Sequence, residues 1–113
     1  MTILLSTFNG EQCVEALLHS LVDQTYPAID ILVRDDGSKD KTLAIIESFA
    51  AAYPNIKILK GENLGVTGSF MALLSEVRYG SPFMFCDQDD IWDDSKIQTF
   101  LIEYANQMKK VCL

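Results

Sequence analysis

Five aspartates within eight residues form the densest group of chemically useful side chains in this 113-residue sequence: Asp87, Asp89, Asp90, Asp93 and Asp94. Two carboxylates about 5 Å apart repel each other by about 3 kcal/mol at an effective dielectric constant near 20. A carboxylate near the amino end of a helix recovers only about 0.3–1 kcal/mol. Capping of a helix that begins near residue 95 therefore explains Asp93 and Asp94, but not the whole group.

A bound divalent cation would remove the repulsion within this group. In an extended Asp-x-Asp segment the first and third side chains leave the backbone on the same side. Asp87 and Asp89 can therefore bind one ion that prefers oxygen ligands, and we predict that this ion is Mn²⁺ or Mg²⁺.

The acidic group directly follows a short apolar run, residues 83–86, which is typical of a strand buried on both faces of a parallel sheet. Hydrophobic periodicity predicts strands over 3–5, 29–33, 56–59 and 83–86, and helices over 11–24, 41–53, 69–79 and 95–110. This alternation predicts a single α/β domain over residues 1–113. We expect a three-layer α/β/α, Rossmann-like fold with a mostly parallel sheet between the helices.

Polar turns follow the predicted strands, and parallel strands place such turns at one edge of the sheet. Asp35 and Asp36 follow the second strand and form either a tight turn or a ligand contact, since an aspartate there can accept hydrogen bonds from a base or a ribose. The glycines in and before the loop 63–68 match no phosphate-binding motif, so this loop does not form a phosphate site by itself. It is either a loop with a helix cap or part of a ligand pocket. Phe8 is either a core or rim aromatic or a surface on which a flat base stacks.

Composition limits the partners that this chain can bind. The formal net charge of −7 argues against nucleic acid, because phosphate binding requires clustered lysine and arginine. Three cysteines without metal-ligand spacing, Cys13, Cys86 and Cys112, indicate reduced thiols in a reducing compartment. No apolar stretch is long enough to cross a membrane, and the first residues lack the charge and cleavage site of a secretion signal. We therefore expect a cytoplasmic protein.

Four motifs follow one another over nearly the whole chain: Ser6-Thr7-Phe8-Asn9-Gly10, Arg34-Asp35-Asp36-Gly37-Ser38-Lys39-Asp40, Asn63-Leu64-Gly65 and Cys86-Asp87-Gln88-Asp89-Asp90-Ile91-Trp92. Together they resemble the amino-terminal half of family 2 glycosyltransferases of the GT-A fold. The Asp-Gln-Asp-Asp-Ile-Trp variant is similar to that of bacterial rhamnosyltransferase-like members, which build surface polysaccharides.

This resemblance implies an inverting, metal-dependent transfer of a sugar from a nucleoside diphosphate sugar to a saccharide or lipid-linked acceptor. The implied nucleotide-sugar-binding residues are Ser6, Thr7, Phe8, Asp35, Asp36, Asn63, Gly65, Gly68, Asp87 and Gln88, and the implied metal ligands are Asp87 and Asp89. Residues 6–8 would border the nucleoside, and Asp36, or alternatively Asp35, would face the base or ribose. The loop 63–68 would line the donor pocket.

Two departures from the family pattern bear on activity. Many members carry an Arg-Asn pair after Asn-x-Gly, where this chain has Ser69-Phe70-Met71, so we expect no basic diphosphate contact from that helix. The family domain is also longer and supplies the general base and acceptor site from its second half. We predict a donor-binding part that does not turn over alone and that self-associates through apolar surface at 83–86 or the last helix. In the full-length protein it would lie in the cytoplasm, with a peripheral position at the inner face of the membrane as an alternative.

Three other functions fit part of the pattern. A haloacid-dehalogenase-type phosphatase also has Asp-x-Asp after a strand, but that motif normally opens the chain. A phospho-accepting, receiver-like signalling domain is doubly wound too, but would carry acidic residues after its first strand, where Ser6-Thr7-Phe8 stand. A nucleotide-binding module without catalysis requires only the donor pocket.

Overall fold

The computed structural model describes residues 1–78 and 80–112, with side chains as far as residue 107. Strands and helices alternate along the chain: β1 Thr2–Thr7, α1 Val14–Val22, β2 Asp30–Asp35, α2 Thr42–Ala52, β3 Ile56–Lys60, α3 Gly65–Leu74, β4 Phe83–Asp87 and α4 Lys96–Cys112. All four predicted strands and all four predicted helices are present.

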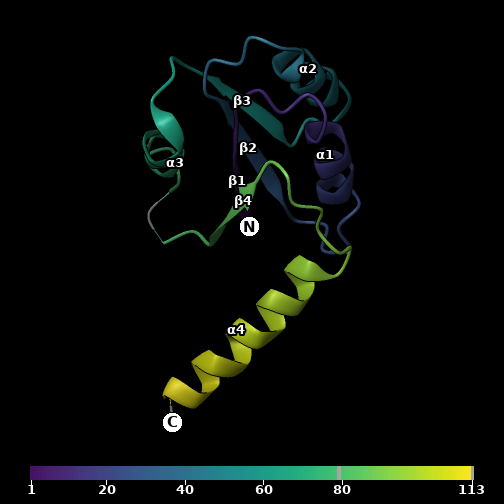
Figure 1. The fold of residues 1–113 in the computed structure, drawn as a ribbon. Helices are drawn as coiled ribbons and strands as arrows, with labels where there is room; N and C mark the ends of the chain where they lie inside the picture. Colours follow the sequence, from purple (N-terminus) through teal and green to yellow (C-terminus); the bar gives the residue numbers. More distant parts are fainter. Residues whose placement is uncertain (79, 113) are drawn as a thin grey trace.

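The four strands form one parallel sheet in the order β3-β2-β1-β4. Helices α1 and α2 cover one face of this sheet and α3 covers the other (Figure 1). The predicted α/β/α arrangement is therefore confirmed. The register places Thr7 beside Asp35 and Ser6 beside Asp87, so the polar ends of the three neighbouring strands β2, β1 and β4 lie together at one edge.

The main core lies between the sheet and the helices α1 and α2. Alternate residues of β1 and β2, namely Ile3, Leu5, Ile31 and Val33, are fully buried in it together with Leu17, Leu18 and Leu21 of α1. Alternation follows from the period of two in a strand, which sends every second side chain to the same face. The opposite face of β1 and β2, toward α3, carries Ser6 and Arg34, whose side chains both bond Ser69 of α3.

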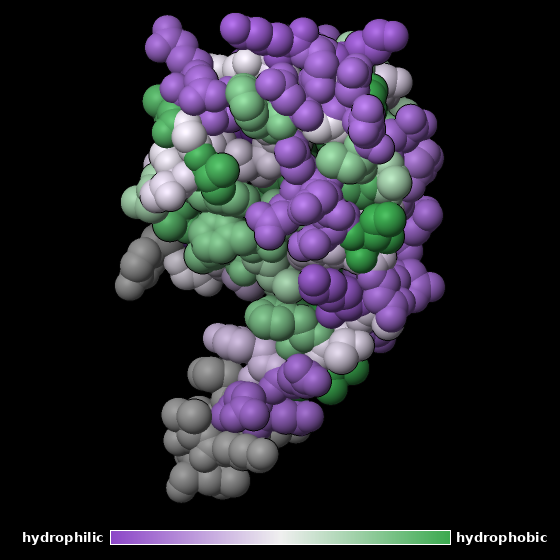
Figure 2. Space-filling model, viewed as in Figure 1, coloured by the Kyte–Doolittle hydropathy of each residue, from purple (hydrophilic) through white to green (hydrophobic). Residues whose placement is uncertain are grey.

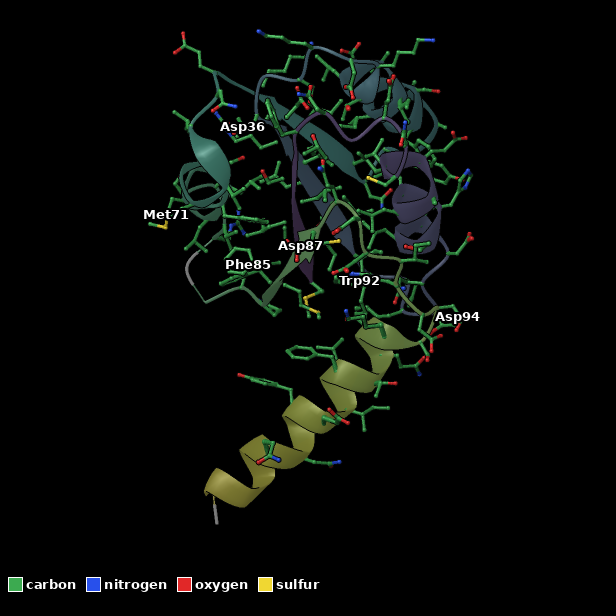
Figure 3. All side chains as sticks on the ribbon, viewed as in Figure 1. Asp36, Met71, Phe85, Asp87, Trp92 and Asp94 are labelled. Carbon is green, nitrogen blue, oxygen red and sulfur yellow. The ribbon has the colours of Figure 1, made fainter. Side chains whose placement is uncertain are left out.

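Strand β4 lies at the edge of the sheet, and the prediction that it is buried on both faces is wrong. Only Cys86 is buried in the core, whereas Phe83 and Phe85 remain 37% and 52% exposed. An apolar run alone cannot distinguish an edge strand from a central one, because burial depends on the neighbours of the strand. Figure 2 shows the resulting hydrophobic surface between α3 and α4, where Figure 3 places Phe85.

Helix α3 begins and ends earlier than predicted. The hydrophobic periodicity predicts a helix over residues 69–79, with the following Gly80 as its end, but the helix spans Gly65–Leu74. Gly80 has a positive φ of 83° and lies in the connection to β4. Four of the six residues of the predicted loop 63–68 therefore form the first turn of the helix, and this turn forms a wall of the pocket described below.

Helix α4 packs only through its beginning and then projects away from the sheet (Figure 1). Ile97 is fully buried and Leu101 is partly buried, but Tyr104, which the helical periodicity of the sequence predicts to face inward as well, is 55% exposed. The same periodicity predicts an inward position for Met108, whose side chain lies outside the described side chains. None of the described helices combines the length and the apolar composition that crossing a membrane requires.

The start of α4 is held by Gln24, not by the aspartates that we expected to cap it. The Asp93 carboxylate accepts only a long 3.5 Å hydrogen bond from the Ser95 N–H, and no such bond is present for Asp94 among the described side chains. Gln24 Oε1 instead accepts from the N–H of Ile97 at 3.1 Å, and its Nε2 donates to the Asp93 carbonyl at 2.6 Å. A side chain from the end of α1 thus provides the cap.

Candidate functional site

A pocket of about 500 Å³ opens at the carboxyl edge of the sheet between β1, β4 and α3. This volume lies within the range of about 300–1,000 Å³ typical of small-molecule sites. Its lining consists of Ser6, Thr7, Phe8, Asp36, Asn63, Gly65, Val66, Phe70, Asp87, Gln88 and Asp89. Figure 3 shows the labelled Asp36 near the start of α3 and Asp87 at the end of β4.

The structure brings nine of the eleven predicted site residues into this lining, and the two that it leaves out are Asp35 and Gly68. Phe70 is an additional lining residue, and Val66, which was predicted only as part of the loop 63–68, also lines the pocket. Both belong to α3, and the late predicted start of this helix concealed Val66 in a loop.

Asp35 stabilises the turn after β2. Its Oδ1 accepts hydrogen bonds from Thr7 Oγ1 at 2.9 Å and Ser38 Oγ at 2.6 Å, and its Oδ2 accepts from the Ser38 N–H at 2.9 Å. The carboxylate is buried and joins β1 to the turn. Of the two interpretations given above for this residue, the structure therefore supports the tight turn.

Asp36 caps α3 from a neighbouring element. Its Oδ1 accepts from the Leu64 N–H at 2.8 Å and its Oδ2 accepts from the Gly65 N–H at 3.0 Å. These N–H groups belong to the amino end of α3, where backbone donors have no partner within the helix and where a negative charge is stabilised. The cap explains why α3 begins at Gly65, whose φ of 79° is readily adopted by glycine.

Arg34 is a buried residue beneath the pocket that the sequence analysis did not single out. Its Nη1 donates to Asp36 Oδ1 at 2.6 Å and to Ser69 Oγ at 3.1 Å, and its Nη2 donates to the Glu62 carbonyl at 2.8 Å. A Cβ on Gly61 would collide with the guanidinium group, so this glycine makes room for Arg34. The sequence signals were its place at the start of the second family motif and its position two residues before an aspartate near a strand end.

Ser6 continues this polar connection to α3. Its hydroxyl donates to Ser69 Oγ at 2.6 Å, and Ser69 is fully buried. Together with the bonds from Arg34, this contact ties the ends of β1 and β2 to the second turn of the helix. The floor of the pocket is therefore a hydrogen-bonded unit that three elements share.

Asp87 and Asp89 line the opposite side of the pocket and are both exposed. Within the part of the chain that the structure describes, neither carboxylate accepts a hydrogen bond or pairs with a basic side chain. No group of three or more potential metal ligands occurs among the described residues. The protein thus offers two free carboxylates, which fits a hard cation that takes its remaining ligands from water and substrate phosphates.

Cys86 precedes this acidic pair but does not belong to the site. Burial, and to a smaller extent the negative charge of Asp90, raises the pKa of its thiol to about 12. A neutral thiol facing the core is a poor metal ligand and a poor nucleophile. The chemistry of the pocket therefore rests on oxygen ligands.

Comparison with known proteins identifies the family. The family model described as glycosyl transferase family 2 matches residues 2–112. The chain belongs to glycosyl transferase family 2. For a member of this family, the position of the pocket outside the carboxyl ends of the strands is the expected place for a ligand in an open α/β sheet.

Named relatives of this family 2 chain include two bacterial proteins. It is 38% identical over 99 residues to the dTDP-rhamnosyl transferase RfbG of Shigella flexneri, covering 83% of this chain and 34% of the relative. It is 34% identical to the minor teichoic acid biosynthesis protein GgaA of Bacillus subtilis, covering 87% of this chain and 23% of the relative. The chain therefore spans about a third or less of these relatives.

Among solved structures, the family 2 chain is similar to S. aureus TarS 1-349 in complex with UDP, with a TM-score of 0.79 and 28% sequence identity. The similarity covers 89% of this chain and 30% of TarS 1-349. Family membership and this likeness exclude the phosphatase and receiver-like interpretations, because both belong to other families.

Proposed function

We propose that residues 1–113 form the nucleotide-sugar-binding half of a GT-A glycosyltransferase domain. The reaction would be an inverting, metal-dependent transfer of a sugar from a nucleoside diphosphate sugar to a saccharide or lipid-linked acceptor. The observation that carries this proposal is the shared pocket, which joins a polar turn after β1, the capped start of α3 and the free carboxylates after β4.

The charge of the pocket supports a metal-dependent donor. Asp36 is neutralised by Arg34, but Asp87 and Asp89 have no basic partner among the described residues. A diphosphate would be repelled by these two carboxylates, and a bound Mn²⁺ or Mg²⁺ would offset both charges and stabilise the leaving diphosphate. We assign Asp87 and Asp89 as the residues that hold this ion.

The other side of the pocket supports binding of the nucleoside. Phe8 is 43% exposed at the rim, where its ring can stack on a base. Asp36 Oδ2 accepts one hydrogen bond within the protein and has a second acceptor position, whereas both positions of Oδ1 are occupied. A base or ribose that offers a single N–H or O–H donor would complete the hydrogen bonding of this oxygen.

We also propose that catalysis requires groups outside these 113 residues. Deprotonation of an acceptor hydroxyl needs a base on the side away from the leaving group. The Asp36 carboxylate already pairs with Arg34 and accepts hydrogen bonds from the start of α3. Asp87 and Asp89 are assigned to the metal, so the pocket lining has no remaining carboxylate that could act as the base. The chain alone would then be a nucleotide-binding module without turnover.

The acceptor is proposed from the relatives, whose names connect them with rhamnosyl transfer and teichoic acid synthesis. We infer an acceptor in the synthesis of a surface polysaccharide. The cytoplasmic location, with a peripheral position at the inner face of the membrane as the alternative, stays a prediction.

Calorimetry on the 113-residue chain tests the proposal. Titration with uridine, thymidine and guanosine diphosphates, each with and without Mn²⁺, should give metal-dependent binding of at least one nucleotide. Adenosine diphosphate is the control for unspecific binding of a diphosphate to the metal. Equal binding of all four nucleotides, or no binding of any, would contradict the proposed function.

A further inference from the structure

Gln88 makes an unusual pair of contacts at the edge of the pocket. Its Oε1 accepts a hydrogen bond from the Phe8 N–H at 2.8 Å, and its Nε2 donates to the Phe8 carbonyl at 3.0 Å. Both groups of the side-chain amide thus bind the backbone of one residue. The ladder between β1 and β4 ends at Ser6 opposite Asp87, so the Gln88 side chain extends the connection by two residues beyond the last strand pair.

These contacts place Phe8 through its backbone. Phe8 lies just past the end of β1, and the next residue, Asn9, has a positive φ of 48°. The ring is exposed at the pocket rim, and the pairing of the Phe8 N–H and carbonyl with Gln88 fixes the backbone from which the ring projects. A stacking surface is useful only when it is held in position, because ordering it on binding would reduce affinity.

Gln88 also separates the two proposed metal ligands. Asp87 and Asp89 are its immediate neighbours, and all three residues line the pocket. The Gln88 side-chain amide binds Phe8 and neither of these two carboxylates. The contact therefore acts on the part of the pocket proposed for the nucleoside and not on the part proposed for the metal.

We propose that Gln88 is a positioning residue that sets the stacking surface of Phe8 for the nucleoside, and not a direct donor-binding residue. This inference rests on the proposed function and adds to it a specific role in recognition of the nucleoside. It replaces the direct contact with the sugar nucleotide that the family resemblance implied for Gln88.

Gly10 provides an independent way to disturb this contact. A Cβ on Gly10 would lie 2.5 Å from Gln88 Oε1 and 2.9 Å from its Cδ, so alanine would push the amide off Phe8. The obstacle is the end of a flexible side chain, and the bond from the Gly10 N–H to Thr42 Oγ1 does not require glycine. Gly10→Ala should therefore displace Gln88 while the chain still folds.

The test compares nucleotide binding with binding of inorganic pyrophosphate, both in Mn²⁺ and on the full 113-residue chain. We expect Gln88→Ala and Gly10→Ala each to weaken the tightest-binding nucleoside diphosphate about tenfold, a loss typical of base stacking on an aromatic side chain. Pyrophosphate, which has no base, should bind as it does to the unaltered chain. In the Phe8→Ala background, Gln88→Ala should cause no further loss.

Several results would overturn the inference. Unchanged nucleotide binding in Gln88→Ala, or equal losses for nucleotide and pyrophosphate, would show that Gln88 does not act through Phe8. Additive losses in the double variant Phe8→Ala, Gln88→Ala would indicate a direct contact. Failure of the unaltered chain to bind any nucleoside diphosphate would instead contradict the proposed function itself. Thermal unfolding of each variant identifies losses caused by misfolding, and Gly10→Ala provides the second variant if Gln88→Ala does not fold.

Discussion

Arg34 and Asp36 form a buried ion pair beneath the pocket, with 2.6 Å between Nη1 and Oδ1 and only 4% of each side chain exposed. Arg34 lies near the end of β2 and Asp36 directly follows it, yet their remaining side-chain hydrogen bonds go to α3 and to the segment before it. The pair therefore joins the sheet to the helix that forms one wall of the pocket.

Replacing Arg34 by methionine should destabilise the chain strongly. The substitution leaves the Asp36 carboxylate buried without its cation, and removing one partner of a buried pair costs about 3–5 kcal/mol. Urea unfolding measures this loss. Lys60→Met is the matched control, because Lys60 pairs with Glu47 at 3.5 Å on the exposed surface, where a pair contributes about 0–1 kcal/mol. Similar losses for both variants would contradict a structural role for the buried pair.

The assignment of Asp87 and Asp89 as metal ligands predicts a loss of metal-dependent nucleotide binding in Asp87→Asn and Asp89→Asn. Loss of a residue that merely supports a metal ligand already costs about 10- to 100-fold in metal affinity, so loss of a ligand should cost at least as much. Calorimetry with Mn²⁺ and a nucleoside diphosphate measures it. Asp94→Asn makes the same change of charge outside the pocket lining and should bind normally. Full binding by both pocket variants would refute the assignment.

The alternation of strands and helices, and the convergence of most site residues at one edge, could be predicted from the sequence. Both follow from local hydrophobic periodicity and from the geometry of parallel sheets. Strand β1 is an example, since three consecutive apolar residues, 3–5, are followed directly by its polar end, Ser6 and Thr7. Such predictions do not depend on knowing which helices and strands contact one another in the folded chain.

The features that could not be predicted depend on contacts between distant residues. The start of α3 is set by Asp36, which lies 29 positions before Gly65, and the start of α4 is capped by Gln24, which follows α1. The exposure of Phe85 follows from the position of β4 at the edge of the sheet. Burial of Arg34 requires the space that Gly61 leaves. Periodicity within one segment contains none of this information.

Gln24 should stabilise the attachment of the segment between β4 and α4, residues 88–95, to the end of α1. It is buried and bonds the carbonyls of Ser20 and Asp93 and the N–H of Ile97. Gln24→Leu leaves these backbone groups unpaired, with an expected cost of about 1–3 kcal/mol. The sequence has one tryptophan, Trp92, which is buried next to this contact, so its fluorescence reports the release of the segment.

The control for this variant is Gln98→Leu, because Gln98 is exposed and accepts one hydrogen bond from Thr25. It should unfold at nearly the same urea concentration as the unaltered chain. The Trp92 emission of Gln24→Leu should shift to longer wavelength at lower urea. Coincident fluorescence transitions in the two variants would show that Gln24 does not hold the segment.

The exposed aromatic side chains of β4 should cause self-association of the 113-residue chain. Phe83 and Phe85 pack edge to face with 5.5 Å between their ring centroids, and Phe85 packs in the same way on Phe70 of α3 with 5.0 Å between the centroids. The three rings form one apolar surface beside the unpaired edge of β4. Such edges favour pairing with another chain.

Sedimentation velocity measures this association. Phe85→Lys should shift the distribution of sedimentation coefficients toward that of the monomer, because a lysine at the edge opposes pairing. Ile91→Lys, at another exposed apolar residue, should leave the distribution unchanged. A monomer in the unaltered chain at high concentration would contradict the prediction.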